Sequence, residues 1–159
     1  GLVLNPVSAK ALYTRDPSSV AVLKEDLHGK DLQNTEYVKY DLSGQDLGEA
    51  NLQGAYMSVT TAKNASFKGA NMKDLIAYAT RFDNADLSDA NLTNGELMKS
   101  VFDGAIIDGT DFTDANLDLK TRKSLCERAT GTNSQTGVDT FESLECSGLK
   151  GYTPPKPKA

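Results

Sequence analysis

Few residues of this chain are of the types that perform catalysis. His28 is the only histidine among the 159 residues, and no serine or cysteine stands beside it in a recognisable nucleophile motif. The sequence contains neither G-x-S-x-G nor H-E-x-x-H, and its glycines do not form a phosphate-binding loop. We therefore predict no enzyme, no catalytic residue, no cofactor and no metal site, and we interpret His28 as a structural or solvated residue.

Carboxylates are numerous in the chain. It holds 22 Asp and Glu against 17 Lys and Arg, which gives a net charge of −5 and a pI near 4.9. This balance argues against nucleic acid as a direct partner and against an anionic membrane surface. No apolar stretch approaches the roughly 18 residues that a membrane-spanning helix needs, so we expect no membrane insertion. A length of 159 residues suits a single domain.

The residues that must position these side chains follow a five-residue period. Every fifth residue from Leu27 to Leu117 is apolar, and the residue two positions before each centre is small throughout 50–115 except at Leu75. Leu75 shares its pentapeptide with the undersized centre Ala77, so the two exchange volume as a packed interior requires. On an α-helix, side chains five residues apart would point in different directions around the axis, and on a flat strand they would alternate between the two faces. The chain must therefore turn a corner about every five residues.

Four of these pentapeptides match the signature A(D/N)LXX, with the apolar centre in third place: 50–54, 85–89, 90–94 and 115–119. On these residues the chain resembles the pentapeptide-repeat family. The resemblance implies an all-β solenoid, a right-handed quadrilateral β-helix of about five coils over residues 25–119, with four pentapeptides in each coil. It implies little about activity, because one fold serves many functions.

Four pentapeptides per coil would place residues 20 apart above one another, so side chains group into faces. Five carboxylates would share one face: Asp46, Glu49, Asp86, Asp89 and Asp108. Such a group could bind a cation weakly, but we interpret it as a solvated face.

A second face would be apolar. It carries Val38, Tyr56, Val59, Ile76, Tyr78 and Met98, which we call the apolar stripe. Exposed apolar patches often mark interfaces, so we interpret the stripe as a candidate protein-interaction surface. Two alternatives remain: the tail or a cap folds back over the stripe, for example through Tyr152, or the exposure is incidental.

A solenoid has two open ends that must be covered, and we expect short α-helical caps at both. In the N-terminal segment 1–24, Asp16 followed by Pro17 predicts the start of a helix over residues 18–24.

At the other end we expect a two-helix cap over residues 120–150. Asp118 predicts the start of a helix that runs through Cys126, with Gly131 just beyond its end. Residues 130–138 are predicted to form a loop, and a second helix begins at 139 or 140 and stops at Gly148. The Pro- and Lys-containing tail 151–159 is predicted to be disordered.

Both cysteines lie in this C-terminal cap, one in each predicted helix. An antiparallel helix pair would bring Cys126 and Cys146 together, and we favour a disulfide that stabilises the cap by about 3 kcal/mol. Two buried free thiols are the alternative. A disulfide would indicate an oxidising compartment or a redox-sensitive latch.

The whole chain, with its expected helical caps and cysteine pair, resembles the small pentapeptide-repeat proteins of the plant thylakoid lumen. The resemblance implies the chloroplast thylakoid lumen as the location. It also implies a mature form without its transit peptide, which agrees with the start at Gly1.

We prefer a non-enzymatic protein-binding or scaffold module, a monomer or weak dimer that uses the apolar stripe. One alternative is a redox-sensitive accessory protein switched by the cysteine pair. Another is an acidic DNA mimic that inhibits a DNA-binding enzyme, since some relatives inhibit gyrase, and residues 25–119 hold 17 Asp and Glu against 7 Lys and Arg. A short solenoid and residence in the lumen argue against DNA mimicry.

Overall fold

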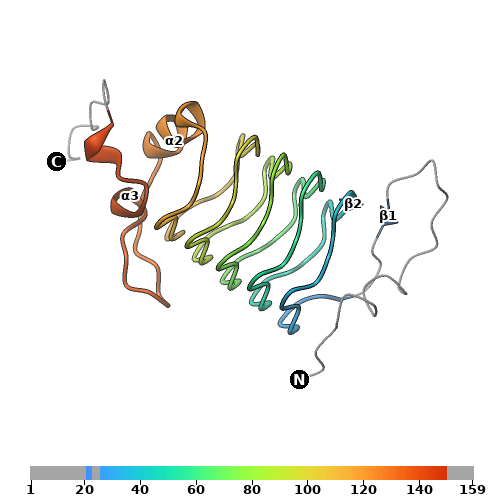
Figure 1. Cartoon of the computed structure of the whole chain (residues 1–159). Coiled ribbons are helices and arrows are strands. Elements are labelled where there is room, and N and C mark those ends of the chain that lie inside the picture. The colour runs from blue at the N-terminus through green and yellow to red at the C-terminus, as the bar shows by residue number, and fades with distance from the viewer. Residues whose placement is uncertain (1–20, 23–25, 150–159) are drawn as a thin grey trace.

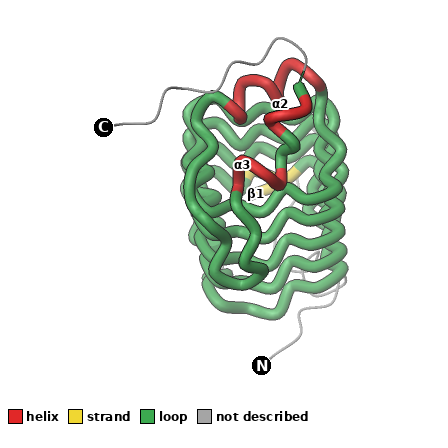
Figure 2. Tube along the Cα trace, turned by 90° about the vertical axis from the view of Figure 1, so that its left-hand side faces the viewer, coloured by secondary structure: helices red, strands yellow, loops and turns green. Residues whose placement is uncertain are grey.

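The computed structural model describes residues 21–22 and 26–149. The chain winds into a stack of coils around one interior, and its helices gather at the C-terminal end (Figures 1 and 2). The elements of the described part are β1 (Ala21–Val22), β2 (Tyr40–Asp41), α2 (Leu119–Cys126), α3 (Thr140–Ser143) and the short 3-10 helix η1 (Cys146–Gly148). Between β2 and α2 the coils consist of turns joined by single bridging residues, because the chain changes direction after every pentapeptide.

Successive coils are joined through residues 20 apart, the spacing that four pentapeptides per coil require. One column of parallel bridges runs through Asp31, Asn51, Asn71, Asn91 and Asp111. Three further columns begin at Glu36, Asp41 and Asp46. The surface is therefore a grid, in which columns run along the solenoid and rows run around each coil.

Main-chain hydrogen bonds hold this grid in register. The Leu32 N–H donates to the Asn51 carbonyl at 2.7 Å, and the Asn51 N–H donates back to the Lys30 carbonyl at 2.9 Å. The corner between them is closed by the Thr35 N–H, which donates to the Leu32 carbonyl at 3.3 Å. Because the same pattern recurs in later coils, a residue's place in its pentapeptide decides whether its side chain points inward or outward.

The interior is filled by the apolar centres and the small residues of the pentapeptides. Its largest fully buried side chains are aromatic, namely Tyr37, Phe67, Phe82 and Phe112. The rings of Phe82 and Phe102 stack with their centroids 5.1 Å apart. Leu75 and Ala77 are both 0% exposed, so the larger residue at the small position and the small residue at the centre both belong to the interior.

The N-terminal end differs from the expected helical cap. Of the predicted helix 18–24, only residues 21 and 22 are described, and they form β1, which pairs in parallel with β2. The helix prediction is therefore wrong for these two residues, and the rest of it lies outside the described residues. The open edge of the first coil offers unpaired main-chain groups, and a segment with Val at alternate positions suits a strand better than a helix.

At the C-terminal end, α2 begins where Asp118 predicts a helix. Asp118 occupies the N-cap position, but its carboxylate does not cap the helix and instead accepts the Lys99 N–H at 2.7 Å. The helix ends at Cys126 with Glu127 as its C-cap. Gly131 therefore does not end the helix. Its φ is +81°, and a Cβ at this position would lie 2.8 Å from the main-chain N of Gly109, so only glycine fits there.

The second predicted helix is divided in two. α3 ends at Ser143, and Glu145 adopts a left-handed conformation (φ 53°, ψ 40°) before η1 begins at Cys146. The predicted tail 151–159 lies outside the described residues. In the part of the chain that the structure describes, no helix combines the length and the apolar character needed to cross a bilayer.

The volume exchange between Leu75 and Ala77 can be tested by substitution. We expect Leu75→Ala to lower the free energy of unfolding by about 2–5 kcal/mol, because it leaves a cavity between two alanines. Adding Ala77→Leu should recover more than half of that loss, because it restores the volume of the pair. Urea unfolding followed by circular dichroism measures both effects.

Leu92→Ala, at another fully buried position, is the matched control. Ala77→Leu should not rescue this variant. Strictly additive effects of Leu75→Ala and Ala77→Leu would show that the two side chains do not share one space.

Candidate protein-interaction surface

The six residues of the apolar stripe lie on neighbouring columns of the grid. Tyr56 and Ile76 are direct partners in the column that begins at Glu36. Val38, Tyr78 and Met98 occupy the first position of the adjoining corner, at intervals of 20 or 40 residues, and Val59 occupies the second position of the same corner. The structure thus gathers the stripe on one mid-face column and the corner beside it.

Most of the stripe is exposed. The exposed fractions are 42% for Val38, 43% for Tyr56, 52% for Val59 and 47% for Tyr78. Ile76 and Met98 are half-buried. Sequence reasoning missed Leu119, which is 58% exposed and directly follows Asp118, the residue bonded to Lys99 at one end of the stripe. It is the last residue of the pentapeptide 115–119 and the first residue of α2, and the stripe is defined only on the pentapeptides before it.

Val59 has an unusual backbone conformation. Its φ is +57°, in the left-handed region that a β-branched side chain rarely adopts. Equivalent corners elsewhere hold residues that tolerate this region better, such as Asn64, Asn84 and Gly104. Positions of this kind cost about 1–3 kcal/mol and persist where the surrounding structure enforces them.

The loop after α2 does not cover the stripe. Residues 130–138, which we call the strap, run back along a different corner of the coils (Figure 1). Asn133 donates to the carbonyls of Ala90 (3.0 Å) and Gly109 (2.9 Å), and Gln135 donates to the carbonyl of Gly69 (3.0 Å). Tyr152, named as an example of the alternative in which the tail covers the stripe, lies outside the described residues.

The strap also uses part of the acidic face. The Asp89 carboxylate accepts the Ser134 N–H at 2.6 Å and the Ser134 hydroxyl. Asp108 accepts the Thr130 hydroxyl at 3.0 Å. These two carboxylates therefore hold the strap, so the face is not simply solvated. Among the described residues, no three His, Cys, Asp or Glu side chains come together as a metal site would require.

His28 is paired with the same face. Its Nδ1 lies 3.0 and 3.1 Å from the carboxylate oxygens of Asp46, and its Nε2 lies 3.8 Å from Glu49. The hydrogen bond that His28 donates to Asp46, followed by the charge of that carboxylate, raises the pKa of His28 above its ordinary value of 6.5. The hydrogen bonds from His28 and from the Gly48 N–H lower the pKa of Asp46. This arrangement forms an ion pair and offers no nucleophile.

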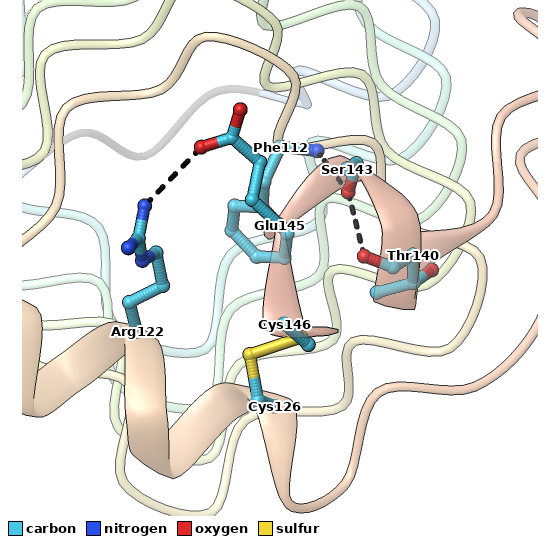
Figure 3. Close-up of a disulfide and its surroundings, with 7 residues drawn as sticks. All are labelled: Phe112, Arg122, Cys126, Thr140, Ser143, Glu145 and Cys146. Carbon is cyan, nitrogen blue, oxygen red and sulfur yellow. Dashed lines mark hydrogen bonds and ion pairs between the residues drawn. A yellow bond between two sulfur atoms is a disulfide. The ribbon is translucent and has the colours of Figure 1, made fainter. Parts of the chain in front are cut away.

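Cys126 in α2 and Cys146 in η1 form a disulfide, with their Cα atoms 5.6 Å apart (Figure 3). The two residues are 2% and 0% exposed. Neither cysteine is free, so the alternative of two thiols is wrong for this structure.

The same cap is tied to the last coil by side chains. The Ser143 hydroxyl accepts the Phe112 N–H at 2.9 Å and donates to the Thr140 carbonyl at 2.7 Å (Figure 3). Arg122 and Glu145 form an exposed ion pair at 3.4 Å. The disulfide therefore joins α2 to η1, while α3, which precedes η1, hydrogen-bonds the end of the solenoid.

The disulfide should stabilise the cap more than the coils. We expect Cys126→Ser with Cys146→Ser to cost about 3 kcal/mol, because the bond closes a loop of about 20 residues in the unfolded chain. Hydrogen exchange should speed up in α2, α3 and η1 and remain slow in the coils around 50–100. Reduced wild-type protein is the control and should behave alike. Unchanged exchange in the cap would contradict this expectation.

The His28–Asp46 pair predicts a pH dependence. His28 gives one imidazole NMR titration, and its pKa should fall toward the ordinary 6.5 in Asp46→Asn. Because the folded pKa of His28 is raised, its contribution to stability is present below pH 6.5 and is lost as the pH rises through the folded value. Because the pKa of Asp46 is lowered, its contribution is lost as the pH falls through that folded value.

The difference in thermal stability between wild type and Asp46→Asn should therefore be largest between about pH 4 and pH 6.5. Calorimetry over that range measures it. An identical His28 titration in the two proteins would show that the pair does not form in solution.

Comparison with known proteins follows the repeat pattern. Eight copies of the family model "Pentapeptide repeats" match residues 41–74 and 80–118. The chain is 53% identical over 47 residues to the thylakoid lumenal protein TL20.3, chloroplastic, of Arabidopsis thaliana. That match covers 30% of this chain and 17% of the relative, so the chain spans less than a fifth of the relative's length.

Two crystal structures are also similar. The pentapeptide repeat protein Rfr23 from the cyanobacterium Cyanothece 51142 is 26% identical, with a TM-score of 0.54 over 65% of this chain and 68% of that protein. A pentapeptide repeat protein from the Arabidopsis thaliana thylakoid lumen is 30% identical over 77% of this chain and 92% of that protein, with a TM-score of 0.34.

Both Arabidopsis relatives are thylakoid-lumenal, which confirms the predicted location in the chloroplast thylakoid lumen. The repeats and the cyanobacterial structure agree on the fold, because proteins of this kind form right-handed quadrilateral β-helices. With eight repeat copies and 30% identity across 92% of a lumenal pentapeptide repeat protein, the chain belongs to the pentapeptide-repeat family.

Proposed function

We propose that this chain is a non-enzymatic protein-binding module of the thylakoid lumen and that it binds its partner through the apolar stripe. The observation that supports this most is Val59. It is 52% exposed and holds a left-handed backbone conformation that disfavours a β-branched residue. An apolar side chain that stabilises neither the core nor the corner is best explained by a contact with another molecule.

The composition of the stripe supports the same proposal. Tyr56 and Tyr78 present rings with 43% and 47% of their surfaces exposed, and tyrosine is enriched among the residues that dominate binding energy. A tyrosine ring has few rotatable bonds, so ordering it on binding costs little entropy.

The scaffold beneath the stripe is rigid on both sides. The Met57 N–H donates to the Ile76 carbonyl at 2.7 Å, and the Val59 N–H donates to the Tyr78 carbonyl at 2.9 Å. A surface fixed in this way is preorganised, because the backbone has little freedom left to lose when a partner binds.

The residues with reactive side chains support a role without catalysis. His28 is bound to Asp46, and Cys126 is joined to Cys146. A cavity of about 250 Å³ lies between α2 and residues 100–103. Its lining includes the hydroxyls of Ser100 and Ser124, but no hydrogen bond in the described part of the chain joins either to Asp103 or Lys120.

The experiment is capture of partners from a thylakoid-lumen extract by immobilised protein. We expect Tyr56→Ser with Tyr78→Ser to lose the partner that wild type retains. Val59→Asn should also weaken capture, while it raises the free energy of unfolding by about 1 kcal/mol, because asparagine tolerates positive φ.

Ile106→Ser is the matched control, because Ile106 is 49% exposed on a different column. It should capture as wild type does. Equal capture by wild type and the tyrosine variant would overturn the proposed surface.

A second candidate is redox control of this same surface. Asp118, at the start of α2, accepts the Lys99 N–H at one end of the stripe, and α2 carries Cys126. Reduction of the disulfide would loosen α2 and with it this contact. Capture that is unchanged by reduction would leave the disulfide with a structural role alone.

A further inference from the structure

Charged residues border the apolar stripe in a regular pattern. The mid-face column reads Glu36, Tyr56, Ile76 and Glu96 from coil to coil. The second corner column reads Lys39, Val59, Ala79 and Lys99. Over these four coils each column has a charge at both ends and apolar residues between, and the two columns carry opposite signs; the next coil continues them with the uncharged Asn116 and Leu119.

Hydrogen bonds fix the rows of this pattern. In the corner, the Lys39 N–H donates to the Ser58 carbonyl at 3.2 Å, and the Ala79 N–H donates to the Met98 carbonyl at 2.9 Å. In the mid-face column, the Ala77 N–H donates to the Glu96 carbonyl at 2.8 Å. Rows one and four are therefore charged across the stripe, and rows two and three are apolar.

Between the two charged columns lies a third. It holds Val38, Ser58, Tyr78 and Met98, which form the first positions of the same corner. Three of these four side chains are apolar and none is charged; the next residue at this spacing is Asp118, whose carboxylate accepts the Lys99 N–H.

We infer that the partner of the apolar stripe is a second copy of this chain, bound about a two-fold axis that runs parallel to the solenoid along the column of Val38 and Tyr78. This inference rests on the surface of the proposed function and names its occupant. A two-fold interface is isologous, so each row would face the same row of the partner with its columns exchanged.

Of the two-fold axes parallel and perpendicular to the solenoid, the charges agree only with the parallel one. In row one Glu36 would face the partner's Lys39, and in row four Glu96 would face the partner's Lys99. In the rows between, Tyr56 would face the partner's Val59. A two-fold axis across the solenoid would instead set Glu36 against the partner's Glu96, and like charges in contact are unfavourable.

The charged groups are suitably placed for such contacts. Glu96 is held in place, because its carboxylate accepts the Met98 N–H at 3.1 Å and the Asn116 amide at 2.8 Å. Lys39 and Lys99 are exposed, and no ion pair engages their ammonium groups within 26–149. Glu96 is therefore ordered, and the ammonium groups of Lys39 and Lys99 are available.

The patch is small, so the dimer should be weak. Interfaces that bury less than about 1,200 Å² belong to weak or transient complexes. We expect a Kd on the order of 100 μM, dominated by the tyrosine and valine contacts, with the charged rows deciding the orientation.

Sedimentation equilibrium of the full chain, from about 10 μM to 1 mM, tests the inference. Wild type should shift from monomer to dimer over this range. Lys39→Glu with Lys99→Glu should stay monomeric, and so should Glu36→Lys with Glu96→Lys. An equimolar mixture of the two variants should form a heterodimer at least as tight as the wild-type dimer, because every charged row then pairs correctly.

Two controls keep the result decisive. Lys63→Glu with Lys73→Glu makes the same charge change on other columns and should dimerise as wild type does. Glu96→Lys removes the contacts with Asn116 and Met98, so circular dichroism must show the native spectrum. If that variant fails to fold, Glu36→Lys mixed with Lys39→Glu repeats the test on row one alone.

A wild type that stays monomeric at 1 mM would overturn the inference, as would dimers that ignore both charge changes, or variants that fail to combine. These outcomes leave the proposed function intact if Tyr56→Ser with Tyr78→Ser still loses a captured lumenal partner. If Tyr56→Ser with Tyr78→Ser still captures the lumenal partner and still dimerises, both the proposed function and the dimer are overturned.

Discussion

The structure depends on one ladder of main-chain hydrogen bonds that joins residues 19 to 21 apart. Leu32 to Asn51 and Asn51 to Lys30 illustrate its two directions. Because the ladder repeats at every coil, it leaves each pentapeptide only two inward positions and three outward ones. An insertion of a single residue would move all later side chains to the wrong side of the wall. The small inward residues and the aligned surface columns both follow from this constraint.

A fixed grid also explains how so small a protein can present a specific surface without a cleft. The coil register decides which side chains are neighbours on the surface. Residues 20 apart in the sequence can therefore form one charged or apolar patch that extends over several coils. Tyr56 and Ile76 touch through the backbone ladder, although 20 residues separate them. The conformation of Val59 follows from the same rule, since the corner imposes positive φ on whatever residue occupies that position. Rigidity of the scaffold therefore gives the stripe both its shape and its strain.

The ends of the ladder follow different physics from its middle. A coil at the end has main-chain groups that no further coil can satisfy. At the C-terminal end, groups from outside the repeats accept these N–H groups: the Ser143 hydroxyl accepts the Phe112 N–H, and the Thr130 carbonyl accepts the Gly109 N–H. At the N-terminal end β1 pairs with β2. The disulfide lies only in the C-terminal cap, where the short helices have little hydrophobic core of their own.

The repeat, the buried centres, the Leu75–Ala77 exchange and the columns of the apolar stripe could all be worked out from the sequence. Each recurs many times in a five-residue period, and the same corner bond and the same step of about 20 residues repeat along the chain. The β1 pairing, the division of the last helix at Glu145, and the course of the strap could not. Asn133 reaches Ala90 across 43 residues, and Asp118 bonds Lys99 rather than its own helix. Such contacts occur once, between segments whose meeting is decided by which main-chain groups the last coil leaves unpaired, and only the tertiary structure shows which those are.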